Sequence, residues 1–205
     1  MFASKNMDVD AMNKKVLDRL NVSNVEEERH FKSIDEIADD GTDQHMHYPI
    51  EYLNSLNPPG VPPHDLHLKE GAIVMLLRNL AVHNGLCNGT RLRVESMGAF
   101  VLCCRFIAGE RNGHIVIIPR IDNHCDSRLP FRLMRRQYPV RLAFAMTINK
   151  SQGQTSSKVG LHRPTELFSP GKLSVVLSGV RSCDDMKIRT NGPAVANIVY
   201  TEVLS

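Results

Sequence analysis

The sequence has little that would carry a protein into or across a membrane. No apolar run approaches the roughly 20 residues that span a bilayer, and residues 1–15, MFASKNMDVDAMNKK, contain no apolar signal core. Cys-x-x-Cys pairs are also absent. The five cysteines are irregularly spaced, which favours reduced thiols over a disulfide framework. These absences favour a cytosolic or nuclear protein with no membrane partner.

Charge is unevenly distributed along the chain. Residues 1–66 carry 6 Lys and Arg against 13 Asp and Glu, whereas residues 67–205 carry 19 against 9. A basic second part is consistent with a polyanionic partner. The net charge of only +3 is equally consistent with a protein that has no such partner.

One stretch, Arg135–Thr155, combines an apolar segment with a polar loop: RRQYPVRLAFAMTINKSQGQT. The apolar segment Val140–Met146, bounded by a proline and the loop, predicts a buried strand. The loop, residues 147–155, offers hydroxyls, amides and one ammonium, and Gly153 allows close approach of the backbone to a ligand. Such groups suit phosphate oxygens of a nucleotide or of a nucleic acid.

The first third of the chain predicts two helices joined by a polar segment. Apolar residues recur with helical spacing over residues 8–20, and residues 48–56 predict a second, short helix. Residues 21–47 are polar and acidic, which indicates a loop. Within that loop Ile34-Asp35-Glu36 has the acidic pair of a Walker B strand, but no apolar strand precedes it, so we reject a Walker B assignment.

From Leu68 onward, short apolar segments alternate with Asn-Gly turns, which predicts a small β-barrel. The strands are expected at 72–77, 91–96, 100–107 and 114–119, and residues 120–138 are expected to be irregular. After the polar loop we expect a strand at 158–161, a helix at 170–177, a strand at 186–188 and a helix at 193–204. Strands alternating with helices on both sides of the barrel indicate an α/β sheet. The expected parts are 1–66 and 139–205, which form the α/β sheet, and 67–138, the inserted barrel.

Three blocks closely resemble the Pif-type (petite integration frequency) DNA helicases, and the branch encoded by Helitron transposons in particular. They are Arg135–Thr155, Gly71–Val94 (GAIVMLLRNLAVHNGLCNGTRLRV) and Tyr48–Gly71 (YPIEYLNSLNPPGVPPHDLHLKEG). The resemblance implies a second RecA-like domain with an inserted Src-homology-like barrel, in which residues 147–155 are helicase motif five. It also implies a nuclear location, with mitochondria as the alternative.

The family resemblance implies ATP-driven, 5′-to-3′ DNA unwinding with Mg²⁺, in recombination, repair or telomere maintenance. In such motors a first RecA-like domain supplies the phosphate loop. No GxxxxGK[ST] occurs in this sequence, since Gly171-Lys172 is followed by Leu173. The chain therefore resembles the C-terminal part of a helicase, with single-stranded DNA and the missing ATPase half as its partners.

The resemblance assigns contacts with DNA phosphates to Thr147, Asn149 and Lys150. The paired arginines that open the block, Arg135 and Arg136, are further candidates for DNA contact. Hydroxyl, amide and cationic donors of this kind grip phosphate without reading sequence. The alternative is that the block is a capped strand-to-helix turn with no ligand.

The resemblance places Gln152 and Gly153 at the edge of the nucleotide. Motif six departs from the family, because the position of the arginine that would reach the γ-phosphate is Gly179. Removing such an arginine finger costs on the order of 10³-fold or more in rate. Arg181, the remaining nucleotide-edge candidate, lies two residues on, about 200° around a helix. We therefore expect the chain to be inactive alone.

Two histidine pairs, His45-x-His47 and His64-x-x-His67, have spacings that could chelate a metal. No cysteine or carboxylate constellation in the sequence completes four ligands, so we expect surface histidines and no metal site.

Arginines between residues 128 and 141 are interleaved with Phe131 and Tyr138. This pattern suits nucleic-acid binding by charge and stacking, and equally a solvated face with core aromatics. The whole chain likewise leaves alternatives open: part of a helicase, a non-catalytic single-stranded nucleic-acid-binding remnant, or a decayed transposon remnant without function.

Overall fold

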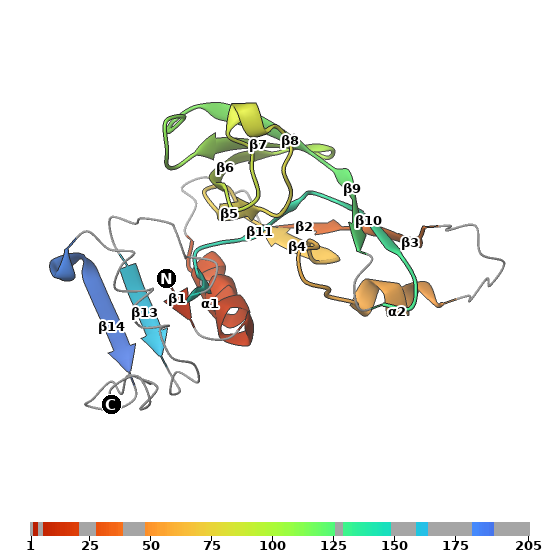
Figure 1. Ribbon diagram of the computed structural model, residues 1–205, viewed down its shortest axis with the longest axis horizontal. Helices are drawn as coiled ribbons and strands as arrows, with labels where there is room; N and C mark the ends of the chain where they lie inside the picture. Colours follow the sequence, from red (N-terminus) through yellow and green to blue (C-terminus); the bar gives the residue numbers. More distant parts are fainter. Residues whose placement is uncertain are drawn as a thin grey trace, which may run out of the picture. The chain divides into compact units, whose positions relative to one another are not determined.

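The computed structural model describes residues 2–3, 6–20, 28–38, 48–125, 129–148, 159–163 and 182–190. The chain divides into two compact units (Figure 1). Unit 1 combines Met1–Asp18 with Phe144–Ser205, and unit 2 is Arg19–Ala143. Within the described ranges, no helix has the length and apolar character required to cross a membrane.

Unit 1 is a parallel sheet whose strands come from the sequence before and after unit 2. Its order is β12-β1-β13-β14, and every neighbouring pair is parallel. Its elements are β1 (Phe2–Ala3), α1 (Asn6–Asp18), β12 (Met146–Thr147), β13 (Val159–Arg163), the 3-10 turn η2 (Cys183–Asp185) and β14 (Met186–Thr190). A parallel sheet whose first strand is followed by a helix confirms the α/β class and the strands expected near residues 158 and 186. The helices expected at 170–177 and 193–204 lie outside the described residues.

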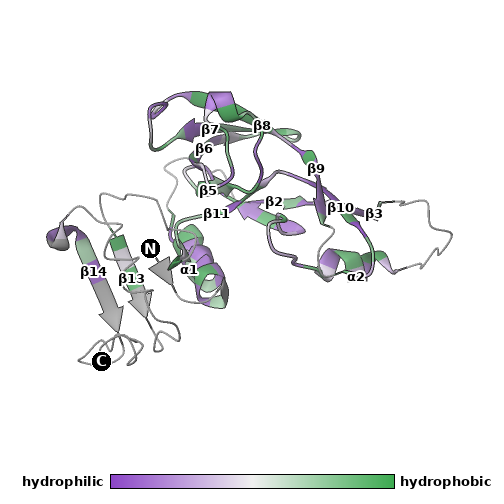
Figure 2. Ribbon diagram, viewed as in Figure 1, coloured by the Kyte–Doolittle hydropathy of each residue, from purple (hydrophilic) through white to green (hydrophobic). Residues whose placement is uncertain are grey.

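Helix α1 forms where the apolar spacing predicted it. Val9 and Met12 lie one turn apart and pack with Ala145, forming a small buried cluster. Figure 2 shows the alternation of apolar and polar residues around this helix. The acidic Asp8 in the first turn and the basic Lys15 in the last turn both complement the helix dipole.

Unit 2 contains a five-stranded antiparallel sheet of order β11-β5-β6-β7-β8. Its strands are β5 (Ile73–Leu76), β6 (Arg91–Met97), β7 (Val101–Phe106), β8 (Ile115–Pro119) and β11 (Val140–Leu142), and a 3-10 turn, η1 (Val82–Asn84), follows β5. Four of the strands confirm the sequence prediction. Gly89 and Gly113, in the two Asn-Gly turns, have φ of 91° and 88°. Residues with a side chain rarely adopt positive φ, which explains glycine at these positions.

Two smaller sheets complete unit 2, and the sequence analysis predicted none of their five strands. One has the order β3-β10-β9 and the other pairs β2 with β4. Their strands are β2 (Arg29–Lys32), β3 (Ile34–Ile37), β4 (Asp65–Leu68), β9 (Ile121–Cys125) and β10 (Leu133–Gln137), and a short helix, α2 (Ile50–Ser55), lies between β3 and β4. The predictions of a loop at 21–47 and of irregular structure at 120–138 were therefore wrong where these strands lie.

The burial of β3 explains why its pattern was misleading. Ile34 is 55% exposed and Ile37 36% exposed, whereas Asp35 is buried. This is the reverse of the usual alternation, in which apolar residues face the core. The strand is therefore held by pairing with β10 and by a buried charge, not by an apolar face.

The apolar segment Val140–Met146 is not one strand, as predicted, but two. Val140–Leu142 is β11 in the antiparallel sheet of unit 2, and Met146 opens β12 in the parallel sheet of unit 1. Ala143 and Ala145, between the two strands, are buried. The segment looked continuous in sequence because both strands and the connection between them consist mostly of apolar residues.

The units also differ from the three expected parts. The inserted region begins near residue 19, not 67, because β2 pairs with β4 and β3 pairs with β10. It ends at residue 143 because β11 pairs with β5. Among the described residues β11 and β8 are not paired with each other, so the closed barrel stays a prediction.

Candidate nucleic-acid interface

The carboxyl ends of two adjacent parallel strands mark the candidate interface in unit 1. Phe2 pairs with Met146 and Ala3 with Thr147, so β1 and β12 end at the same edge of the sheet. Ligands of open α/β sheets bind beyond the carboxyl ends of the strands. Thr147, a predicted phosphate contact, is half-buried at this edge, where the polar loop begins.

A buried asparagine in α1 fixes the backbone that leads into this edge. Asn13 is buried, and its Nδ2 donates to the carbonyl of Ala145 at 3.2 Å. In return the amide of Ala145 donates to Asn13 Oδ1 at 2.7 Å. This pair of bonds imitates a strand pairing and holds the chain two residues before Thr147. The sequence analysis missed Asn13, because a polar residue in an amphipathic helix is usually on its solvent face.

The remaining candidates of the polar loop and of motif six cannot be placed. They lie outside the described residues: Asn149, Lys150, Gln152, Gly153, Gly179 and Arg181. Their assignments, and the substitution of the arginine finger at Gly179, stay predictions.

Arg135 is a core residue, which corrects its assignment as a DNA contact. Its side chain is 0% exposed. Nε and one terminal nitrogen donate to the two oxygens of Asp35 at 2.8 and 2.5 Å. The terminal nitrogens also donate to the carbonyls of Leu53 at 3.0 Å, Leu56 at 3.0 Å and Pro62 at 3.1 Å. Five N–H groups meet five acceptors, so no donor is left for a phosphate.

Further polar groups extend this buried network. Ser33 Oγ donates to Asp35 Oδ1 at 2.5 Å and lies 2.8 Å from His64 Nδ1. Gln137 Nε2 donates to the carbonyls of Phe31 at 2.5 Å and His64 at 3.2 Å. Together these bonds join β2, β3 and β10 to the segment between α2 and β4. The network is structural, and it pairs the carboxylate of Asp35, for which the sequence analysis rejected a Walker B assignment.

Arg136 points the other way and reaches solvent. Its guanidinium forms a two-bond pair with Asp122, with Nε–Oδ1 2.6 Å and Nη2–Oδ2 2.9 Å. Hydrogen bonds from Arg136 lower the pKa of the Asp122 carboxyl, so the pair stays charged. The accessible guanidinium keeps Arg136 a prediction as a DNA contact, with a charge that Asp122 partly offsets.

The two aromatic residues considered for base stacking are packed in unit 2. Tyr138 is fully buried, meets Phe31 edge-on at 5.3 Å between ring centroids, and donates from its hydroxyl to the carbonyl of Gly98 at 3.2 Å. Phe131 packs against Tyr48 at 4.5 Å. Of the two alternatives for this segment, the structure supports core aromatics for Tyr138.

The chain is similar in sequence and in fold to known DNA helicases. Residues 51–97 match the family model of the DNA helicase Pif1 2B domain. The chain is 37% identical to the rat ATP-dependent DNA helicase PIF1 over 136 residues, which are 63% of this chain and 20% of the relative. The chain therefore spans about a fifth of the length of this curated relative.

Solved structures show the same fold over nearly the whole chain. The Pif1 helicase of Candida albicans matches with a TM-score of 0.68 and 21% identity, over 94% of this chain and 45% of that one. A Bacteroides Pif1 helicase in complex with ADP-AlF3 and single-stranded DNA matches with a TM-score of 0.67 and 21% identity, over 99% of this chain and 43% of that one. The family model and the rat relative confirm the Pif-type resemblance read from the sequence, and the solved structures share the fold.

Proposed function

Because the chain is related to the Pif1 DNA helicases in sequence and in fold, we propose that it is the C-terminal portion of an ATP-dependent DNA helicase that contacts single-stranded DNA. The observation that carries this proposal is the 37% identity to a PIF1 helicase over 63% of the chain. The short share of the relative that is covered, 20%, leaves room for a separate ATPase half. That half, the first RecA-like domain, would hold most of the ATP and Mg²⁺ site.

The finer assignment is a second RecA-like domain with an inserted Src-homology-like barrel. The parallel sheet of unit 1 and the five-stranded antiparallel sheet of unit 2 support it. The resemblance further suggests 5′-to-3′ translocation, a role in recombination, repair or telomere maintenance, descent from a Helitron helicase, and a nuclear or mitochondrial location.

We assign the contact with DNA phosphates to the start of the polar loop. Thr147 lies at the carboxyl end of β12, beside the end of β1, where a parallel sheet presents its ligands. Asn149 and Lys150 lie two and three residues further along the sequence and add an amide and an ammonium. Gln152 and Gly153, a few residues on, are assigned to the nucleotide edge.

Binding to a labelled oligonucleotide, followed by fluorescence anisotropy at two salt concentrations, tests this assignment. The full chain should bind single strands, and the affinity should fall steeply as salt rises. Lys150→Ala should weaken binding and lower the salt slope by about 0.7, the value for one phosphate contact on a single strand. Lys14→Ala, which removes the same charge from the exposed face of α1, is the matched control. Equal losses in both variants would show that only total charge matters.

A second candidate function is a non-catalytic remnant that binds single strands. It is favoured by the glycine at position 179, where the family resemblance expects the arginine finger. ATP hydrolysis distinguishes the two, measured after mixing the chain with a first RecA-like domain from a Pif1 relative. Gly179→Arg should raise the rate on the order of 10³-fold if only the finger is missing. No hydrolysis in either mixture would support the remnant.

A further inference from the structure

The ribbon formed by β2 and β4 gathers four metal-binding side chains on one face. In this antiparallel pair, His30 lies directly opposite His67. Glu28 lies two residues before His30, and Asp65 two residues before His67, so all four share a face. The other face is apolar, with Phe31, Leu66 and Leu68 buried. Backbone pairing of β2 with β4 and burial of the apolar face would not by themselves require these four side chains.

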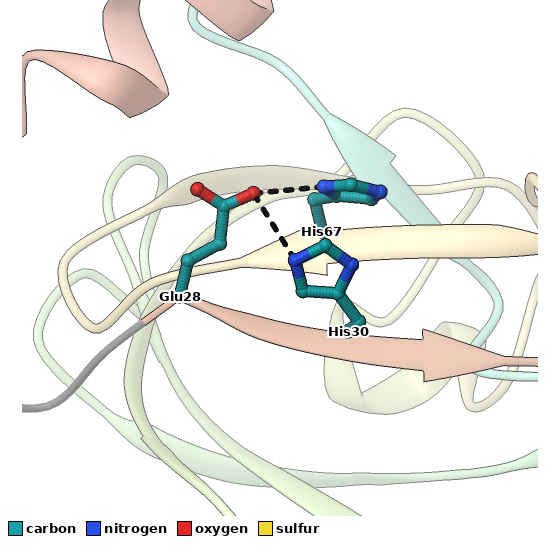
Figure 3. Close-up of side chains that lie close together, drawn as sticks. All are labelled: Glu28, His30 and His67. Carbon is teal, nitrogen blue, oxygen red and sulfur yellow. Dashed lines mark hydrogen bonds and ion pairs between the residues drawn. The ribbon is translucent and has the colours of Figure 1, made fainter.

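Three of these side chains already converge on one point. Figure 3 shows the Glu28 carboxylate and both imidazole rings turned toward one another. Glu28 Oε1 is 2.8 Å from His67 Nδ1 and 3.7 Å from His30 Nε2. One ligand atom from each of the three residues lies within 4.8 Å of the others. A tetrahedral zinc ion, with bonds of about 2.0–2.1 Å, separates its ligand atoms by about 3.3 Å. The distances of 2.8 and 3.7 Å lie on either side of that spacing.

Asp65 supplies the outer support that metal-binding histidines require. Its Oδ2 is 3.1 Å from His67 Nε2, and its Oδ1 is 3.7 Å from His30 Nδ1. Histidine ligands usually donate their second ring N–H to a carboxylate, which fixes the tautomer and the ring orientation. One carboxylate therefore faces the outer nitrogens of both rings, and the inner nitrogens face Glu28.

The charge around the cluster also suits a cation. Two carboxylates surround two imidazoles, and the opposing charges nearby are Lys69 and Lys32, which lies opposite Asp65 on the ribbon. The Nζ of Lys69 lies 3.8 Å from Glu28 Oε2, the oxygen that does not face the histidines. The side chains of His30 and Asp65 are 50% and 41% exposed, so a cation can enter from solvent.

We propose that Glu28, His30 and His67 bind a divalent transition-metal cation of the zinc class, with Asp65 as the outer carboxylate. Two imidazoles and one carboxylate are a known zinc ligand set that leaves one position open to water. The bound cation links β2 to β4. It thereby stabilises the two-stranded ribbon, which is a weakly stable unit by itself. This site lies in unit 2 and does not depend on the proposed helicase function.

Equilibrium dialysis of the full chain against Zn²⁺, after EDTA treatment, measures the site directly. We expect one bound equivalent at micromolar Zn²⁺ that Glu28→Gln and His30→Gln each weaken at least tenfold. Asp65→Asn should weaken binding 10- to 100-fold, as loss of an outer carboxylate does. His114→Gln, which removes an exposed histidine away from the ribbon, is the matched control and should bind as the parent does.

Substituting Co²⁺ for Zn²⁺ adds a spectroscopic readout, because a bound cobalt ion absorbs in the visible range according to its geometry. A visible band that disappears in His30→Gln supports the site. No binding to the parent chain at micromolar Zn²⁺, or equal binding by the parent and by His30→Gln, overturns the proposal. Circular dichroism of each variant separates loss of binding from loss of folding. Because the side chain of His30 is half exposed, His30→Gln should keep the fold.

Discussion

Replacing the buried Arg135 tests the central correction to the sequence reading. In Arg135→Met, the Asp35 carboxylate remains buried with a hydrogen bond from the Ser33 hydroxyl, and His64 Nδ1 lies 3.8 Å from its second oxygen. Removing one partner of a buried ion pair costs about 3–5 kcal/mol. Three carbonyls that Arg135 satisfied, those of Leu53, Leu56 and Pro62, also lose a donor. Each unsatisfied buried group adds about 1–3 kcal/mol unless water enters.

A loss of this size is a large part of the total stability of a domain, about 5–15 kcal/mol. With a urea m-value of about 1–3 kcal/mol/M, it lowers the unfolding midpoint by at least about 1 M. Urea titration followed by far-ultraviolet circular dichroism measures the midpoint, and hydrogen exchange of the β10 amides assigns the loss to unit 2. Arg136→Met is the matched control, because the adjacent guanidinium is exposed and pairs at the surface.

A double-mutant cycle separates the ion pair from the carbonyl bonds. Asp35→Leu combined with Arg135→Met removes both charges, so it should be more stable than Arg135→Met alone. It should still be less stable than the parent, because the three carbonyls remain without their donor. Equal midpoints for Arg135→Met and Arg136→Met would refute the reasoning, since they would mean that Arg135 is not buried in solution.

Two other predictions concern ionisable groups of the five-stranded sheet. Hydrogen bonds from Arg105 and Arg93 lower the pKa of Glu95, so the stability that this carboxylate adds is present above its ordinary pKa and is lost as the pH falls through the lowered one. Glu95→Gln should therefore be less stable than the parent at pH 7, by less than about 1 kcal/mol for a partly exposed pair. The urea midpoints should converge in acid, and a constant difference down to pH 3 would contradict this. Burial raises the pKa of Cys104 to about 12, so in the folded chain at pH 8 it should resist alkylation that modifies the half-buried Cys87. Peptide mass spectrometry measures both rates, and equal rates would count against the burial.

Local patterns predicted much of this fold where a strand has one apolar face. In β6, Leu92 and Val94 are fully buried while Arg93 between them is exposed, and such alternation can be read from the sequence alone. The strand β3 could not be predicted in this way. Its buried residue is Asp35, whose partner Arg135 lies far along the chain, so only the tertiary contact explains the burial.

The candidate sites also divide into those that local sequence predicts and those that depend on tertiary contacts. The loop that begins at Thr147 could be predicted because its residues are contiguous and resemble a known motif. Arg135, in the same block, was misread because an arginine in a basic run is usually at the surface. The cluster of Glu28, His30 and His67 was missed because its members lie far apart in the sequence, and only the register of β2 against β4 brings them together.

The parallel sheet of unit 1 has a consequence for synthesis of the chain on the ribosome. The backbone of β1 pairs with β12 and β13, which are made only after all of unit 2. At about 5–20 residues per second, translation of the intervening residues takes on the order of ten seconds. Unit 2 has all its strands within that time, whereas β1 has no neighbour to join. We therefore expect the inserted unit to fold first during translation, and its host to fold around β1 only when the later strands emerge.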